Sequence, residues 1–265
     1  MFERDIVRDV GATLANILMG FSLDIFRLIT HSRGRVIERT SVASSIQILT
    51  PLIPSERSGG GKAVKELVEL FSDRLKSRLI ALPDLDQAIS KARKKIAEVL
   101  LSGIPAQKTS LHFMLGGDVL DDNLVQGIPI FIEFSEGATF LLFRRRLQEF
   151  TILRDHEILL RRYDREGAAP LAIMKAIREA SAKYLCKSFL RNLYAKVDVI
   201  VTLTSEDASY IRQRFAPVGA KVVSVPVVFE AKYEDYRGDE GAPEGDDGNE
   251  SRDLLFLGNL YHQPN

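Results

Sequence analysis

Cysteine is nearly absent from this 265-residue chain, which contains only Cys186. A single thiol cannot form an internal disulfide, so nothing indicates a disulfide-stabilised secreted scaffold, and a reducing cytosol fits better. Neither sign of charge is in excess, because 36 Lys and Arg residues balance 36 Asp and Glu residues. Bulk electrostatics therefore give no reason to expect nucleic acid as a partner.

Long hydrophobic runs are also missing. The longest uncharged stretch near the start, Val10 to Leu23, is too short to span a bilayer, and Asp24 and Arg27 follow it closely. The first five residues mix acidic and basic side chains, whereas a secretory signal begins with a basic region. We therefore expect a cytoplasmic protein without a signal peptide.

Several chemical motifs are absent as well. The chain has no G-x-S-x-G nucleophile motif. The spacing D-x-D occurs at Asp84 and Asp86, but at a predicted helix start, where a capping role is the stronger interpretation. No histidines and cysteines have zinc-site spacing. We therefore expect no bound metal. The four histidines are far apart in the sequence, at His31, His112, His156 and His262.

Residues 5–30 have the apolar spacing of an amphipathic helix. One interpretation is a helix that packs on its own domain or on a partner. The other is a helix on a membrane surface, which normally has a basic polar face. Acidic residues Glu3, Asp5 and Asp9 weaken this second interpretation. The apolar residues at this spacing are Val7, Val10, Leu14, Ile17, Phe21, Ile25 and Leu28.

From residue 45 onward, short apolar runs alternate with longer amphipathic segments. This alternation predicts an α/β fold, a Rossmann-like parallel sheet with helices on both faces. Ligands of such sheets bind beyond the carboxyl ends of the strands. The predicted strands are Ile46–Thr50, Arg78–Leu82, Ser110–Leu115, Pro129–Phe134, Thr151–Asp155, Val197–Leu203 and Lys221–Val225. The predicted helices are Gly61–Leu75, Leu85–Leu101, Ala138–Gln148, Leu171–Ala195 and Ser205–Phe215.

Composition divides the chain into four parts. Residues 1–44 form a helical extension, and residues 45–229 form the Rossmann-like domain. Residues 230–250 are acidic and rich in glycine, which predicts a disordered linker. Residues 251–265 read as the first strand of another domain.

Three consecutive glycines, Gly59, Gly60 and Gly61, lie between a predicted strand and a predicted helix. They fit neither phosphate-binding motif, because a P-loop would need glycine at Glu56 and a dinucleotide-binding fingerprint would need it at Val64. Glycines there let a ligand approach the backbone, and the following helix start favours an anion. A turn that needs glycine only for its geometry is an equally good explanation.

The densest polar cluster, "LRDHEILLRRYDRE", directly follows a predicted strand. Asp155, His156 and Glu157 would then lie at the sheet edge where ligands bind. Acidic residues are also common in the first turn of a solvated helix. Histidine exchanges protons near neutral pH most readily, so we favour a functional role for His156.

Several segments together resemble the GT-B glycosyltransferases, specifically the family 4 (glycosyl transferases group 1) type. The similarity covers roughly residues 46–265 and rests on the order and spacing of loose motifs. These are "ILTPLIPSERSGGGKAVKELVELF", "IFIEFSEGATFLL" followed by "TILRDHEILLRRYDRE", "KVDVIVTLTSEDASYIRQRF", "VVSVPVVFE" and "DLLFLGNLYHQPN".

The resemblance implies two Rossmann-like domains facing a cleft, of which this chain contains the amino-terminal, acceptor-side domain. It implies retaining transfer of a sugar from a nucleotide sugar to a glycan or lipid-linked acceptor hydroxyl, without a cofactor. Gly59–Gly61 and Arg161 would lie near the donor, and His156 and Glu157 near the reacting sugar. Lipid-linked acceptors also make contact with the inner face of the membrane plausible, through residues 5–30.

The chain departs from this family in two ways. Val227 and Val228 replace the family's Asn-Gly, and the Glu-x7-Glu motif and diphosphate-binding basic pair belong to a second domain that begins only at residues 251–265. The chain therefore reads as a fragment or a natural truncation, and in the second case we expect no transfer activity from it alone. The alternative is a catalytically inactive Rossmann-like half that serves in binding or assembly.

Overall fold

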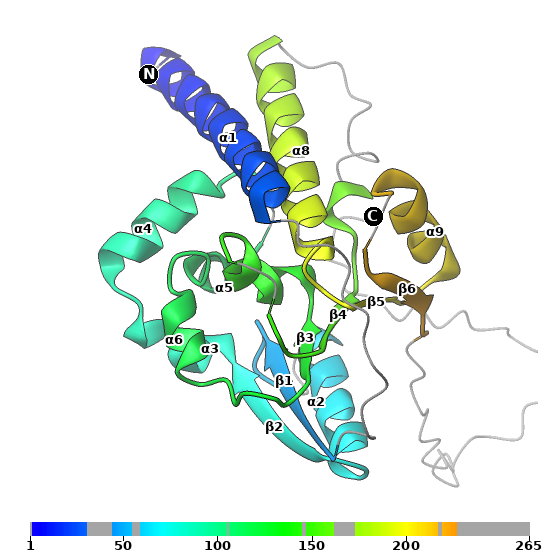
Figure 1. Ribbon diagram of the computed structural model, residues 1–265. Helices are drawn as coiled ribbons and strands as arrows, with labels where there is room; N and C mark the ends of the chain where they lie inside the picture. The colour runs from blue at the N-terminus through cyan, green and yellow to red at the C-terminus, as the bar shows by residue number, and fades with distance from the viewer. Residues whose placement is uncertain are drawn as a thin grey trace, which may run out of the picture. The chain divides into compact units, whose positions relative to one another are not determined.

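The computed structural model describes residues 2–30, 44–54, 59–104, 106–144, 147–161, 173–216 and 219–226. Six strands form one sheet in the order β2-β1-β3-β4-β5-β6, and every neighbouring pair is parallel (Figure 1). The predicted Rossmann-like α/β fold is therefore confirmed. The strands are β1 (Ser45–Thr50), β2 (Lys76–Ala81), β3 (Ile130–Glu133), β4 (Thr151–Asp155), β5 (Val199–Thr202) and β6 (Lys221–Ser224).

Helices surround the sheet, and side-chain caps fix two of their starts. Ser90 accepts a hydrogen bond from the Arg93 amide, and Thr204 accepts one from the Asp207 amide. The α-helices are α1 (Phe2–Thr30), α2 (Gly59–Ser72), α3 (Leu82–Leu85), α4 (Lys91–Leu100), α5 (Lys108–His112), α6 (Gly117–Asp121), α8 (Ile173–Tyr194) and α9 (Ser205–Arg214). Two 3-10 helices are η1 (Asp86–Ala88) and η2 (Ser135–Leu141).

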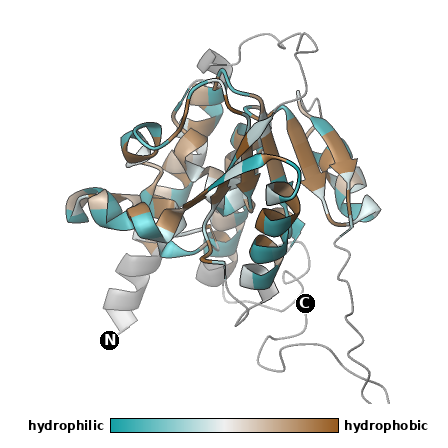
Figure 2. Ribbon diagram, turned by 90° about the horizontal axis from the view of Figure 1, so that it is seen from below, coloured by the Kyte–Doolittle hydropathy of each residue, from teal (hydrophilic) through white to brown (hydrophobic). Residues whose placement is uncertain are grey.

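The sheet buries apolar side chains on both faces, and its strands are predominantly hydrophobic (Figure 2). Successive side chains of a strand point to opposite faces. Ile48 accordingly joins a small cluster with Leu67 of α2, whereas Leu49 joins the main core with Phe189 of α8. Because side chains on both faces are buried, the central strands appear in the sequence as continuous apolar runs.

Three predicted elements are wrong in type or extent. The predicted strand at 110–115 is helix α5, the predicted helix at 138–148 is replaced by η2, and the predicted helix at 85–101 divides into η1 and α4. Three consecutive residues of α5, Ser110, Leu111 and His112, are buried, so the buried positions there do not follow the period of a helix. A short apolar run of this kind cannot be distinguished from a buried strand by its pattern.

Helix α1 packs along α8, as the first interpretation of residues 5–30 predicts (Figure 1). Asn16 donates a hydrogen bond to Ser181 over 3.2 Å, and the Tyr184 hydroxyl donates one to Asp24 over 3.2 Å. Leu23 is fully buried beside them. This helix is thus part of the folded domain rather than a separate extension.

The apolar part of α1 is longer than the sequence analysis allowed. The 18 residues Val10–Arg27 are long and apolar enough to cross a membrane by length and composition alone. Core helices and signal sequences meet the same criterion, so it does not by itself identify a membrane span. The predicted linker at 230–250 and the predicted strand at 251–265 lie outside the described residues.

Candidate functional site

The carboxyl edge of the sheet has one point where the strand order reverses. From β1 the chain crosses to β2 on one side, and then returns to β3 on the other side and continues outward to β6. In parallel α/β sheets, ligands bind beyond the carboxyl ends of the strands that flank such a point, which are β1 and β3 in this sheet. Gly59–Gly61, His156 and Glu157 all lie near the carboxyl end of β1 or β4.

The three glycines form the first turn of α2 rather than a loop before it. A Cβ atom on Gly60 would lie 2.6 Å from Leu52 Cδ1 and 3.6 Å from the Phe134 ring. Gly60 therefore lets the start of α2 come close to the segment that follows β3. The first turn of α2 contains no acidic residue, and the start of a helix favours an anion.

Phe134, the residue directly after β3, has an unusual backbone conformation. Its φ is +63° and its ψ is 144°, and no other non-glycine residue in the described part of the chain has a positive φ. This region of conformational space is almost restricted to glycine, and such strain is concentrated at functional sites. The Phe134 ring stacks on the His156 ring, with the two ring centroids 4.1 Å apart.

Glu133, the last residue of β3, connects this turn to β4. Its carboxylate is fully buried and accepts hydrogen bonds from Arg154 Nε and His156 Nε2, each over 2.9 Å. A second guanidinium nitrogen of Arg154 also donates to it, so the ion pair is bidentate. When neutral His156 donates through Nε2, its lone pair lies on Nδ1, which can accept a proton or a hydrogen bond from a ligand.

Behind His156 lies a second, buried carboxyl group. Burial raises the pKa of Asp155 to about 7, although the Tyr194 hydroxyl donates a 2.7 Å hydrogen bond to its carboxylate. Burial also raises the pKa of Glu136, which lies near enough to Asp155 for the two carboxylates to repel each other. The edge of β4 therefore contains a group that exchanges protons near neutral pH.

Glu157 and Arg161 lie outside the Glu133 network. Glu157 is exposed. Arg161 forms an ion pair with Asp207, in the first turn of α9, and its guanidinium lies 5.7 Å from the Tyr210 ring. Arg161 and Tyr210 also line an open depression of about 440 Å³ along α9, together with Ser205, Glu206, Ser209 and Gln213.

His112 is also buried, but its surroundings differ from those of His156. Its Nδ1 lies 2.7 Å from Asp86 and its Nε2 lies 2.9 Å from Glu98, so both ring nitrogens are occupied within the protein. Such a histidine ties helices together and has no nitrogen left for a ligand. Among the described residues, no group of three His, Cys, Asp or Glu side chains could hold a metal ion.

The site thus joins two sequence predictions that were made separately. Gly60 and His156 both meet the Phe134 ring, and Glu133 holds the histidine. The sequence analysis missed Glu133, Phe134 and Arg154. One signal was available: Glu133 interrupts the apolar run "IFIEF", and a buried carboxylate needs a charged partner.

Comparison with known protein families gives no match for this chain, and comparison with curated proteins gives none either. The geometry of the site and the sequence motifs are therefore the grounds for a functional conclusion.

Proposed function

We propose that this chain is the acceptor-side half of a GT-B glycosyltransferase. In the whole enzyme, a sugar moves from a nucleotide sugar to a hydroxyl group of a glycan or lipid-linked acceptor. The bond between the anomeric carbon and the diphosphate oxygen breaks, and the acceptor oxygen bonds to the same face of the sugar. One observation carries this proposal: the start of α2 at Gly60 and the His156 ring both lie near Phe134, at the reversal of strand order.

The start of α2 supports the placement of the donor. Gly59, Gly60 and Gly61 form its first turn, and the absence of a Cβ atom on Gly60 leaves room for Leu52 beside the helix start. A helix of 14 residues begins there, with no acidic side chain in its first turn. These features favour a negatively charged group and help to stabilise a leaving diphosphate without a metal.

The histidine supports the placement of the sugar. Glu133 fixes the His156 ring through Nε2, so Nδ1 is available to accept a hydrogen bond from a sugar hydroxyl. Glu157 and Arg161 have weaker support. Glu157 is exposed at the same edge, and Arg161 is held by Asp207 beside a separate depression. We assign Glu157 to the reacting sugar and Arg161 to the donor only as secondary parts of the proposal.

Isothermal titration calorimetry of this chain with UDP, GDP and their sugars tests the proposal. We expect one nucleotide to bind with a Kd on the order of micromolar, and Gly60→Val to weaken it by at least about tenfold. The control is Gly219→Val, because a Cβ atom on Gly219 would have no neighbour within 4 Å. Circular dichroism establishes that both variants are folded.

Equal binding by the wild type and Gly60→Val would refute the assignment of the glycines. Absence of binding to every nucleotide and nucleotide sugar would refute donor contact by this half and favour the alternative, a catalytically inactive binding or assembly module. Tight binding of a nicotinamide cofactor would contradict both glycosyltransferase interpretations.

A further inference from the structure

Helix α1 has an apolar face that the described part of the protein leaves uncovered. Six large apolar side chains on this face are between 40% and 65% exposed. They recur at helical spacing, so they form one continuous stripe along the helix. A soluble monomer rarely exposes a contiguous apolar patch of this kind without a function for it. The apolar stripe consists of Val10, Leu14, Ile17, Leu18, Phe21 and Ile25.

The direction of the apolar stripe follows from the contact between α1 and α8. Asn16 and Asp24 meet α8 directly, through Ser181 and through Tyr184 and Ser188. Ile17 and Ile25 come one position later, a rotation of about 100° on the helix, and are exposed. The apolar stripe therefore borders the contact line with α8 on its solvent side.

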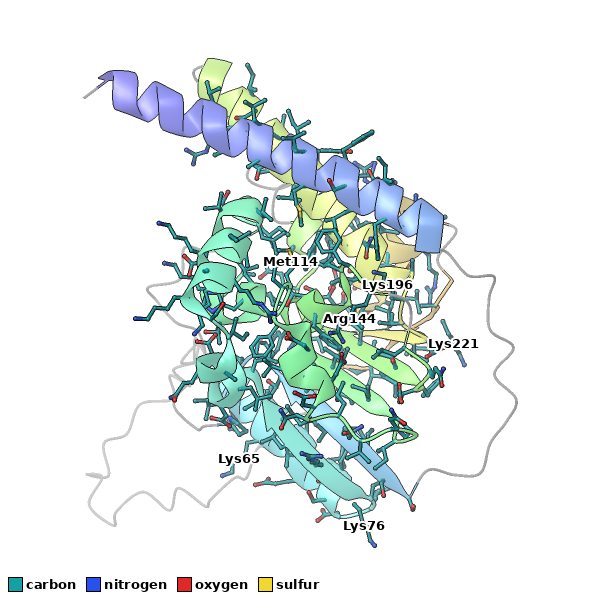
Figure 3. All side chains as sticks on the ribbon, turned by 60° about the vertical axis from the view of Figure 1, so that its left-hand side comes forward. Lys65, Lys76, Met114, Arg144, Lys196 and Lys221 are labelled. Atoms are coloured by element: carbon teal, nitrogen blue, oxygen red, sulfur yellow. The ribbon has the colours of Figure 1, made fainter. Side chains whose placement is uncertain are left out.

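Positively charged side chains of α8 lie along the same line of contact between α1 and α8. Ser188 and Asn192 contact α1, and Phe189, one position after Ser188, is fully buried in the core. Lys187 and Arg191 come one position before Ser188 and Asn192, so they turn away from the core and toward solvent. Figures 1 and 3 show α1 and α8 side by side. The cations of α8 and the apolar stripe of α1 thus both border the line along which the two helices meet.

The cations are close enough to one another to interact. Lys183, Lys187 and Arg191 are four residues apart, and like charges at this spacing destabilise a helix. Burial lowers the pKa of Lys187, and Arg191, Arg214 and Lys183 lower it further, whereas Asp24 acts in the opposite direction. Positive charge is therefore concentrated along one side of α8, and Asp24 offsets part of it. We call Lys183, Lys187 and Arg191 the basic row.

We propose that the apolar stripe and the basic row together bind the surface of an anionic lipid bilayer. The apolar side chains enter the boundary between headgroups and acyl chains, and the basic row meets the anionic headgroups. A second copy of the chain fits less well, since a two-fold interface places the same patch of both copies face to face and the two basic rows would repel. This inference does not depend on the proposed glycosyltransferase activity.

Co-sedimentation of the full chain with vesicles tests the proposal. The vesicles contain phosphatidylcholine alone, or phosphatidylcholine mixed with phosphatidylglycerol. The first variant, Leu18→Ser with Phe21→Ser, changes the apolar stripe. Its control is Leu70→Ser with Leu79→Ser, which removes apolar side chains of 56% and 37% exposure from α2 and β2.

The second variant, Lys187→Gln with Arg191→Gln, changes the basic row. Its control is Lys76→Gln with Lys221→Gln, two exposed lysines that Figure 3 shows away from α1. We expect both controls to bind anionic vesicles like the wild type. We expect the stripe variant to bind at least about tenfold more weakly, because interfacial binding scales with buried apolar area. We expect the basic-row variant to lose about tenfold or more on anionic vesicles only.

Three results would overturn the proposal. The first is no binding of the wild type to either kind of vesicle. The second is equal binding by the stripe variant and the wild type. The third is a lipid-free dimer in sedimentation velocity that the stripe variant converts to a monomer, because the apolar stripe would then be an interface between two copies of the chain.

Discussion

The turn after β3 is under backbone strain at Phe134, and two substitutions at this position measure that strain directly. Phe134→Ala and Phe134→Gly both remove the ring that stacks on His156. The energetic cost of losing the stack is therefore the same in both variants and does not affect the difference between them. The two variants differ in how well they tolerate a φ of +63°. Glycine adopts this conformation without a steric penalty, whereas alanine retains the strain.

The expected difference can be estimated from two opposing terms. Strain at such a position costs about 1–3 kcal/mol for a residue with a Cβ atom. Glycine is normally less favourable than alanine by about 0.4–1 kcal/mol, because the unfolded chain has more freedom to lose. We therefore expect Phe134→Gly to have a free energy of unfolding about 1–2 kcal/mol higher than that of Phe134→Ala, the reverse of the usual order.

Urea unfolding followed by circular dichroism provides the measurement, since the chain contains no tryptophan. The matched control is Ile96, which is 51% exposed in the middle of α4. There, Ile96→Ala should be about 1 kcal/mol more stable than Ile96→Gly. If the alanine variant is also the more stable of the pair at Phe134, the turn is not strained and the argument that locates the site through this strain fails.

Two further predictions concern Asp155 and the contact between α1 and α8. The folded-state pKa of Asp155, about 7, lies above the ordinary value of 3.8 for this side chain, so between these values the folded state binds more protons than the unfolded state. Its contribution to stability is therefore lost as pH rises, and between pH 5 and 8 the free energy of unfolding should fall by up to about 3 kcal/mol more in the wild type than in Asp155→Asn. Urea titrations at several pH values measure this difference, and parallel pH profiles would contradict it. Separately, a Cβ atom on Gly20 would lie 2.6 Å from the Tyr184 ring, whereas one on Gly11 would have no neighbour within 4 Å. In thermal unfolding, Gly20→Ala should therefore destabilise the protein by about 1–2 kcal/mol, whereas Gly11→Ala should stabilise it by up to about 1 kcal/mol, and two shifts of the same sign would exclude a tight contact at Gly20.

The sheet could be predicted from the sequence because its central strands, such as β1, β3 and β5, are buried on both faces. Runs such as Ile130–Glu133 consist mostly of large apolar residues, and the helices between them have their own periodicity. The same criterion failed at 110–115, where a short helix is buried all around and has the composition of a strand. Composition indicates burial, whereas the choice between helix and strand in so short a run depends on tertiary contacts.

Single residues of the candidate site could be predicted from the sequence, but the contacts between them could not. The glycines and His156 stood out by their positions relative to predicted strands. The positive φ of Phe134 follows from contacts between neighbouring strands, and the Glu133–Arg154 pair joins residues 21 positions apart on β3 and β4. The sequence analysis named residues 5–30 for membrane contact, whereas the cations proposed to accompany the apolar stripe lie on α8, in a distant part of the chain.

The pairing of α1 with α8 also limits how early α1 can reach its folded position during synthesis. Asn16 and its partner Ser181 are 165 positions apart. Since chains are synthesised at roughly 5–20 residues per second, α1 leaves the ribosome about 10–30 seconds before its partner helix exists. During this interval the side of α1 that later contacts α8 is uncovered together with the apolar stripe. Transiently exposed apolar surface is what chaperones bind, so we expect chaperones to contact α1 early in synthesis.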